Sequence, residues 1–74
     1  MSAKEMFEEL GYHINIEYDY IYYKNQEENC YIYFYDYQAI ELRCDDSLDV
    51  SVYKAINQQC KELGWIEWNI NWKC

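Results

Sequence analysis

The chain has few of the residues that usually shape turns, bind metals or contact phosphate. Its 74 residues include no proline, two glycines, one histidine and six basic side chains, against fourteen acidic ones. With so little glycine and no proline, the turns must rely on Asn, Asp and Glu. The net charge of -8 argues against direct binding to nucleic acid or to an anionic membrane, because phosphate contacts need Lys and Arg. It suits solubility, or attraction to a basic partner surface.

The cysteines and the histidine do not form a metal-binding pattern. No Cys-x-x-Cys pair is present among Cys30, Cys44, Cys60 and Cys74, and His13 is the only histidine. A zinc site normally shows a close pair of ligands, so we expect no metal and no cofactor. Buried or incidental reduced thiols are the default expectation, and a disulfide is the less favoured alternative.

No catalytic motif is present in the sequence. His13 has no serine or cysteine nucleophile at a recognisable spacing. The paired carboxylates at 27–28 and 45–46 fall in polar loops, where solvent keeps them ionised. We therefore expect that the protein is not an enzyme.

Size and composition favour one folded domain over residues 1–74. A chain this short buries only about 60% of its unfolded surface, so its core is expected to be thin. Half of the residues are hydrophobic and 20% are aromatic, which is unlike a disordered tail. No apolar signal segment and no run of transmembrane length is visible, so we expect a cytoplasmic protein.

Residues 30–37 form the most regular stretch, with a period of two that predicts a strand. Cys30, Ile32 and Phe34 share one face. The opposite face carries a row of tyrosines: Tyr31, Tyr33, Tyr35 and Tyr37. Similar alternation predicts further strands over 12–17, 20–24 and 39–44, joined by turns around 17–19, 25–29 and 36–38. A single long bulged strand is the alternative to the turn at 17–19.

Two helices flank the predicted strands. Ser2 and Glu5 have the spacing of a capping box before a helix over 3–10, and Gly11 can end it. Asp49 is the expected N-cap of a second helix over 50–63, which Gly64 closes. Its apolar stripe is expected to be Tyr53, Ile56, Cys60 and Leu63. Residues 65–72 alternate in polarity and could add an edge strand.

The expected fold is α+β, with an antiparallel sheet of four to five strands and both helices packed on one face. The sheet would bury apolar side chains against the helices: Ile14, Ile16, Ile21, Ile32, Phe34, Ile40 and Leu42. The helices would contribute Met6, Phe7, Leu10, Ile56 and Leu63.

The other sheet face is the candidate binding surface. Residues 17–49 hold nine acids against two basic residues and eight of the ten tyrosines. Tyrosine suits binding surfaces because it offers large, rigid contact area at low entropy cost. The expected partner-binding residues are Tyr20, Tyr22, Tyr31, Tyr33, Tyr35, Asp36, Tyr37, Glu41, Asp45 and Asp46. Two alternatives stay open. In one, the tyrosines only stabilise the sheet; in the other, they form a base-stacking platform, which the acidic flanks disfavour.

Both ends of the chain resemble those of known proteins. Residues 4–12, Lys-Glu-Met-Phe-Glu-Glu-Leu-Gly-Tyr, and 55–65, Ala-Ile-Asn-Gln-Gln-Cys-Lys-Glu-Leu-Gly-Trp, are similar to the ends of small uncharacterised phage and prophage proteins of Gram-positive bacteria. The resemblance covers the two predicted helices and carries no functional residue across. It implies a context in which small acidic proteins often inhibit host defence, as anti-CRISPR proteins do, several of them as nucleic-acid mimics.

These observations lead to two functional hypotheses. In the first, the chain is an anti-CRISPR-like inhibitor that binds a basic, nucleic-acid-processing host defence protein, such as a CRISPR effector, through its acidic tyrosine face. In the second, it is a non-catalytic assembly module that forms a homodimer through the aromatic C-terminal edge around Trp68 and Trp72.

Overall fold

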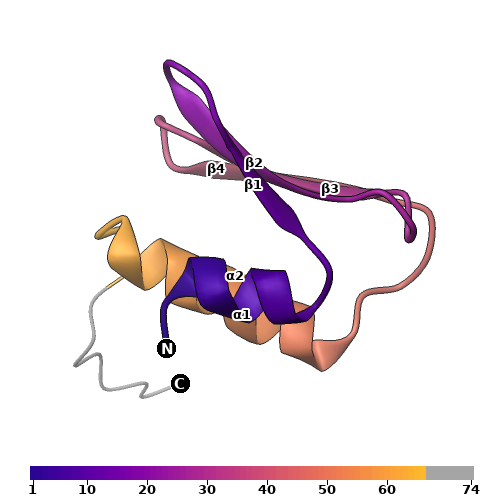
Figure 1. The fold of residues 1–74 in the computed structure, drawn as a ribbon. Helices are drawn as coiled ribbons and strands as arrows, with labels where there is room; N and C mark the ends of the chain where they lie inside the picture. Colours follow the sequence, from indigo (N-terminus) through magenta and orange to yellow (C-terminus); the bar gives the residue numbers. More distant parts are fainter. Residues whose placement is uncertain (67–74) are drawn as a thin grey trace.

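The computed structural model describes residues 1–66 and confirms the α+β class. The elements follow in the order α1 (Ala3–Glu9), β1 (His13–Ile16), β2 (Tyr20–Asn25), β3 (Cys30–Tyr35), β4 (Ala39–Cys44) and α2 (Val50–Glu62). The strands form an antiparallel sheet with the spatial order β1-β2-β3-β4. Figure 1 shows both helices on the same side of this sheet, so the other side is left uncovered by them.

The helix ends follow the predicted caps. The Ser2 hydroxyl accepts from the Glu5 amide, and the Glu5 carboxylate accepts from the Ser2 amide. Asp49 caps α2 by accepting from the Ser51 amide. Gly11 and Gly64 follow the two helices with φ of 91° and 78°, a backbone conformation that side chains disfavour.

In the hairpin turns, residues other than glycine adopt the left-handed backbone conformation. Asn29 and Gln38 take positive φ values of 50° and 62° just before β3 and β4. Asparagine tolerates this conformation well, as the sequence suggested, whereas glutamine was not expected there. The turns fix the register, so that Ile32 pairs with Tyr23 on β2 and with Leu42 on β4.

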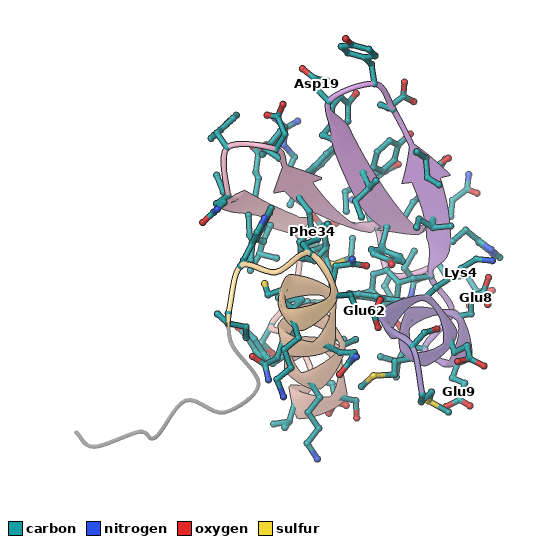
Figure 2. All side chains as sticks on the ribbon, turned by 90° about the vertical axis from the view of Figure 1, so that its left-hand side faces the viewer. Lys4, Glu8, Glu9, Asp19, Phe34 and Glu62 are labelled. Atoms are coloured by element: carbon teal, nitrogen blue, oxygen red, sulfur yellow. A yellow bond between two sulfur atoms is a disulfide. The ribbon has the colours of Figure 1, made fainter. Side chains whose placement is uncertain are left out.

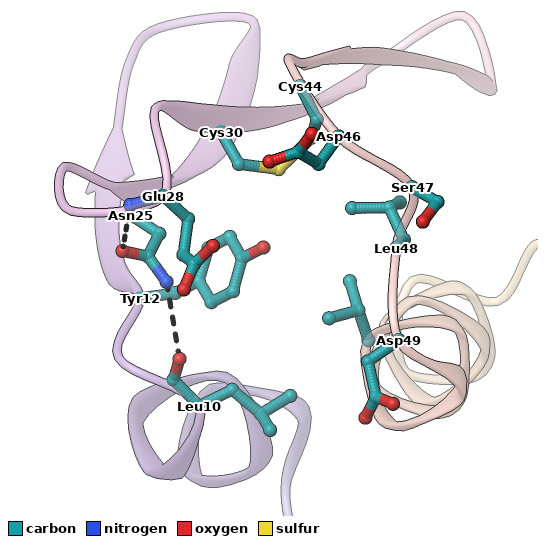
Figure 3. A pocket seen from close by; sticks show the side chains of 11 residues that line it. Leu10, Tyr12, Asn25, Glu28, Cys30, Cys44, Asp46, Ser47, Leu48 and Asp49 are labelled. Carbon is teal, nitrogen blue, oxygen red and sulfur yellow. Dashed lines mark hydrogen bonds between the residues drawn. A yellow bond between two sulfur atoms is a disulfide. The ribbon is translucent and has the colours of Figure 1, made fainter.

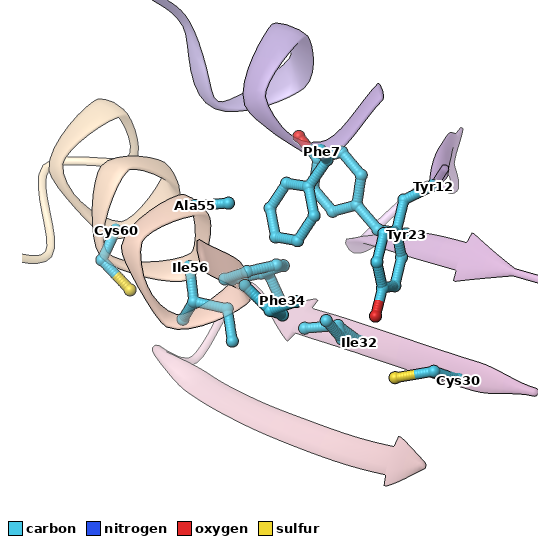
Figure 4. Packing of buried hydrophobic residues seen from close by; sticks show 10 residues of the cluster. Phe7, Tyr12, Tyr23, Cys30, Ile32, Phe34, Ala55, Ile56 and Cys60 are labelled. Atoms are coloured by element: carbon cyan, nitrogen blue, oxygen red, sulfur yellow. The ribbon is translucent and has the colours of Figure 1, made fainter. Parts of the chain in front are cut away.

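The core lies between the two central strands and the helices. Phe34 points from the sheet toward the helices in Figure 2. Figure 4 shows Phe7 of α1 among residues from the sheet and α2. Its ring stacks on Tyr23 with the ring centroids 3.8 Å apart and meets Phe34 edge-on at 6.4 Å. Aromatic packing of this kind is worth more than area alone, which suits a core this small.

Three residues that were expected in the core are exposed instead. Ile16 is 73% exposed, Ile40 is 40% exposed and Leu42 is 44% exposed, although all three lie on the helix side of the sheet. They belong to the edge strands β1 and β4, and the two helices bury mainly β2 and β3. Ile32 and Phe34 are buried and Ile14 and Ile21 are half-buried, so the expectation is correct for β2, β3 and Ile14 of β1.

The predicted stripe of α2 is rotated from its true position. Tyr53 and Leu63 are exposed, and the buried side chains of this helix are Val52, Ala55, Ile56, Gln59 and Cys60. Gln59 can be buried because its side-chain oxygen accepts a hydrogen bond from the Tyr23 hydroxyl. The predicted stripe was based on the spacing of apolar residues, so it could not include a buried polar residue such as Gln59.

The cysteines also differ from expectation, because Cys30 and Cys44 form a disulfide. They stand directly opposite each other on β3 and β4, with Cα atoms 4.1 Å apart. Spacing along the chain could not show this pair, because it depends on the register of the hairpin. Cys60 is a buried free thiol. Disulfides are rare in the reducing cytosol, so the thiol state of Cys30 and Cys44 bears on the expected cytoplasmic location, which stays a prediction.

Neither helix of residues 1–66 is long and apolar enough to cross a membrane. The edge strand proposed for residues 65–72 falls largely on 67–74, outside the described residues. The described part of that stretch packs against the core through Trp65, whose ring lies 6.2 Å from that of Phe34, and through Ile66.

Candidate functional site

The sheet face that the helices leave bare carries a connected row of tyrosines. Alternation along β2 puts Tyr20 and Tyr22 on this face, and β3 adds Tyr31, Tyr33 and Tyr35. The β2–β3 register places Tyr20 opposite Tyr35 and Tyr22 opposite Tyr33. We call the face formed by Tyr20, Tyr22, Tyr31, Tyr33, Tyr35 and Tyr37 the tyrosine face.

The rings of the tyrosine face contact one another without a break. Tyr33 is central, with its ring centroid 5.0 Å from Tyr22, 6.4 Å from Tyr31 and 6.0 Å from Tyr35. Tyr37 extends the row beyond β3 by stacking on Tyr35 at 5.4 Å, and it is 71% exposed. The strand tyrosines are half-buried, and each lies against at least one other ring of the face. Their edges and hydroxyls therefore form a rigid amphipathic surface.

Two basic residues lie on the same face, which the sequence analysis did not anticipate. The Lys24 ammonium is 5.9 Å from the centre of the Tyr31 ring, and the Arg43 guanidinium is 5.5 Å from that of Tyr33. Both distances suit cation–π contacts. Strand alternation could have identified them, since Lys24 is two residues from Tyr22 and Arg43 is two residues from Glu41.

Glu41 links the tyrosines to Arg43. Its carboxylate accepts from the Tyr35 hydroxyl at 2.6 Å and from the Arg43 Nε at 2.9 Å. The bond to Glu41 is the main cause that raises the pKa of Tyr35 to about 12, and the same bond, with Arg43, lowers the pKa of Glu41. Glu41 thus stays ionised and is already paired, so it holds the face together and offers little free charge to a partner.

The other predicted acids lie in three separate places. Asp45 lines a shallow hollow of about 450 Å³ beside Tyr31, Tyr33 and Arg43, and it accepts from the Asn29 side chain. Asp36 lies at the opposite end of the face, in an exposed turn. The backbone amide of Asp36 donates to the carbonyl of Asp19.

Asp46 does not belong to the tyrosine face. It lines a pocket between the sheet and the helices, with Leu10 and Val52 among its neighbours. The acids near the face are therefore grouped at its two ends. Glu17, Asp19 and Asp36 line a hollow beside Tyr20 and Tyr35, and Asp45 lies at the other end.

No group of three or more His, Cys, Asp or Glu side chains in residues 1–66 is arranged to hold a metal ion. Comparison with other proteins adds no assignment: no protein family, no curated protein and no solved structure matches the chain. The geometry of the tyrosine face must therefore carry the functional argument, since fold alone does not define function.

Proposed function

We propose that the chain is an interaction protein that binds a basic protein partner through the tyrosine face. The observation that carries this proposal is the unbroken contact of six tyrosine rings on the sheet face that neither helix covers. Exposed patches of large apolar surface often mark binding sites. Tyrosine and arginine, which occur together here, are both enriched in the centres of protein interfaces.

The charge around the face favours a basic partner. Arg43 is paired with Glu41, and both Arg43 and Lys24 lie against tyrosine rings. The acids at the two ends, among them Asp19, Asp36 and Asp45, are exposed. Residues 17–49 carry a net charge of -7 from nine acids and two basic residues, so a basic surface would be attracted over a distance.

We further propose that the partner is a host defence protein that processes nucleic acid, in the manner of an anti-CRISPR inhibitor. This step rests on the resemblance of residues 4–12 and 55–65 to small phage proteins. It also rests on the exposed acids at the two ends of the tyrosine face, among them Asp19, Asp36 and Asp45, which we call the acidic rim. Proteins that bind nucleic acid present rows of Lys and Arg. Carboxylates beside a flat aromatic surface could occupy such a row in place of phosphates and bases.

Capture of partners by two matched variants tests the role of the face. Replacing Tyr33 with Ser removes the central ring, and replacing Tyr53 with Ser removes an exposed tyrosine of α2. We expect Y33S to lose the proteins that the unmodified chain retains from host lysate, and Y53S to keep them. Circular dichroism would verify that both variants are folded. Equal retention by Y33S and the unmodified chain would refute the tyrosine face as the binding surface.

Single substitutions that each remove one negative charge test the acidic rim. D36N and D45N remove charge at the two ends of the face, whereas E9Q removes it from the exposed surface of α1. We expect D36N and D45N to weaken capture and its sensitivity to salt, and E9Q to leave both unchanged. The retained protein should be a basic nuclease or CRISPR effector whose activity the chain inhibits.

Lys24 and Arg43 support a second candidate, a platform on which single-stranded bases stack. Base-stacking surfaces combine aromatic rings with nearby cations, as this face does. Titration of labelled single-stranded RNA and DNA by fluorescence anisotropy separates the two. Salt-sensitive binding that Y33S abolishes would favour the platform. If neither RNA nor DNA bound even at low salt, the platform would be excluded and a protein partner would stay the proposal.

The alternative of a homodimer through the C-terminal edge involves Trp68 and Trp72, which lie outside the described residues. One described feature favours an assembly role, because Ile40 and Leu42 expose apolar surface on the edge strand β4. Sedimentation over a range of concentrations tests this alternative. A concentration-dependent increase in mass that I40S/L42S removes would support it.

A further inference from the structure

A second concave site lies away from the tyrosine face, between the sheet and the first turn of α2. It is a pocket of about 200 Å³ whose walls come from the end of α1, the β2–β3 turn, the Cys30–Cys44 disulfide and the segment that leads into α2. Figure 3 shows Tyr12 and Glu28 on one side of the pocket and Leu48 and Asp49 on the other, with Asp46 and the disulfide above.

The hydroxyl of Tyr12 is the unusual group in this pocket. The Tyr12 side chain is only 3% exposed, yet its hydroxyl forms no hydrogen bond within residues 1–66. In Figure 3 this hydroxyl points into the open space of the pocket. Burial, and to a smaller extent the charge of Glu28, raises the pKa of Tyr12, so the hydroxyl is neutral at physiological pH. The hydroxyl oxygen is reached through the pocket, because no buried side-chain oxygen or nitrogen of the described residues lacks a hydrogen-bond partner. A donor bound in the pocket can therefore pair with it.

The lining is acidic and has no basic counterpart. Glu28, Asp46 and Asp49 contribute carboxylates, and none of the residues that line the pocket is Lys, Arg or His. Asp49 is partly engaged as the cap of α2, but the side chains of Glu28 and Asp46 make no hydrogen bond or ion pair in the described part of the chain. Concave, low-dielectric walls concentrate the field of such charges.

The pocket also has apolar walls, formed by Leu10, Leu48 and Val52, while Asn25 and Ser47 add uncharged polar groups. The carboxylates are spread around the rim and do not form a metal-binding group. This arrangement suits an extended organic cation with several N–H donors on an apolar stem better than a compact metal ion, which needs convergent ligands.

We propose that this pocket binds an ammonium or guanidinium group, with Tyr12 as hydrogen-bond acceptor and Glu28 and Asp46 as counter-charges. The stem of the ligand packs on Leu48 and Val52, and one N–H donates to the Tyr12 Oη. A free amine and the side chain of a lysine or arginine in a partner protein present the same chemistry. The site is independent of the tyrosine face, so either proposal can fail without the other.

Titration of the ¹⁵N-labelled full chain, followed by amide shifts, tests the site. The probes are butylamine and methylguanidinium, with butanol as a neutral control of similar shape. We expect saturable shifts at the amides of Glu28, Ser47 and Leu48 with both cations and none with butanol. Shifts of the same size with butanol, or none at these amides with either cation, would overturn the proposal.

Matched variants separate a specific site from general attraction to an acidic protein. E28Q removes a carboxylate that lines the pocket. E27Q removes the neighbouring carboxylate in the same turn, which is exposed and does not line the pocket. We expect E28Q and D46N to weaken binding by about tenfold, the effect of losing one charged hydrogen bond, and E27Q to change it little. An equal effect of E27Q and E28Q would show that the attraction is not specific.

Y12F tests the hydroxyl alone, because it preserves the ring that packs in the core. We expect Y12F to weaken binding of butylamine by about tenfold while its thermal stability is unchanged or higher, since no internal hydrogen bond is lost. Unchanged affinity in Y12F would overturn the role of Tyr12. Should Y12F not fold, E28Q and D46N still test the site through its carboxylates, from exposed positions.

The source of the cation is distinguished with short acetylated peptides that contain one lysine or one arginine between glycines. Equal affinity for the peptides and for the free cations indicates a small-molecule amine as the ligand. Affinity that is at least severalfold higher for a peptide indicates a side chain of a protein.

Discussion

The two buried tyrosines on the helix side of the sheet differ in what their hydroxyls contact. The Tyr23 hydroxyl donates to Gln59 of α2, while that of Tyr12 faces an open pocket. Both rings pack against Phe7, so their apolar parts serve the core in the same way. The difference lies in the hydroxyl alone, which makes Tyr-to-Phe substitutions informative at both positions.

Tyr23 should make the protein sensitive to alkaline pH. Burial is the main cause that raises its pKa to about 12, with smaller effects from Glu62 and Glu8. In the unfolded chain tyrosine loses its proton near pH 10. The folded state therefore holds this proton more tightly, and its stability should fall as the pH rises from about 10 through about 12, by on the order of 2 kcal/mol.

Denaturant unfolding at a series of pH values measures this loss, and Y23F provides the reference. The variant should be less stable at neutral pH by about 1 kcal/mol, because Gln59 loses its partner. Its stability should then decline less steeply above pH 10 than that of the unmodified chain. Parallel pH profiles of the two proteins would contradict the buried neutral state of Tyr23.

At the scale of the elements, the β3–β4 hairpin is joined at its open end by the Cys30–Cys44 disulfide. The bond lies next to the pocket and on the strand that carries half of the tyrosine face. It therefore connects the stability of the hairpin to both proposed sites.

Reduction of the disulfide should destabilise the protein without changing its fold. The bond joins residues 14 apart, and a closed loop of this length contributes about 3 kcal/mol in the chain-entropy treatment. We expect the denaturation midpoint to fall when a reductant is added. The C30A/C44A variant should be insensitive to reductant, and an unmodified chain that showed no change would indicate that the bond contributes nothing.

The two helices are joined by one side chain in addition to their apolar contact. The Glu62 carboxylate accepts from the Ala3 amide at the start of α1 and from Gln58 one turn earlier in α2. Figure 2 shows Glu62 between the helices. Because the first amides of a helix have no internal acceptor, Glu62 acts as a cap from a distant part of the chain.

Replacing Glu62 with Ala should lower the free energy of unfolding by about 1 kcal/mol, the usual effect of a lost helix cap. E9A is the matched control, because Glu9 is an exposed residue of α1 that makes no such bond. Thermal unfolding measures both. A loss in E9A as large as in E62A would show that the effect is general to these helices.

At the scale of the whole molecule, acidic charge is concentrated in residues 17–49. Mutual repulsion of like charges opposes folding and is weakened by salt. We expect added sodium chloride to stabilise the protein by on the order of 1 kcal/mol. E17Q/D19N should reduce this dependence, which thermal unfolding at several salt concentrations would show. Stability that fell with salt would mean that attractive charge pairs dominate.

The sequence was sufficient to predict most of the fold. Capping residues and alternation located both helices and the four described strands to within one or two residues, because these signals are local. The six tyrosines of the face were identified for the same reason. The error in Ile40 and Leu42 has a different origin, since alternation shows which side of a sheet a residue faces but not whether a helix covers it.

The parts that were missed depend on contacts between distant residues. The disulfide needs the hairpin register, and the burial of Gln59 needs Tyr23 opposite it. The pocket around Tyr12 brings together residues from 10 to 52, and no local pattern marks it. Asp46 was predicted as a partner-binding residue together with Asp45, but it lines the pocket that Leu10 and Val52 also line.

The position of α2 has a consequence for synthesis of the chain. Each strand pairs with its neighbours in sequence, so the sheet can form as the residues emerge. Phe7 and Phe34, however, share their core cluster with Val52, Ala55 and Ile56 of α2, which is made last among the described elements. The inner side of the newly formed sheet therefore stays open to other chains and to chaperones until residues 50–62 have left the ribosome.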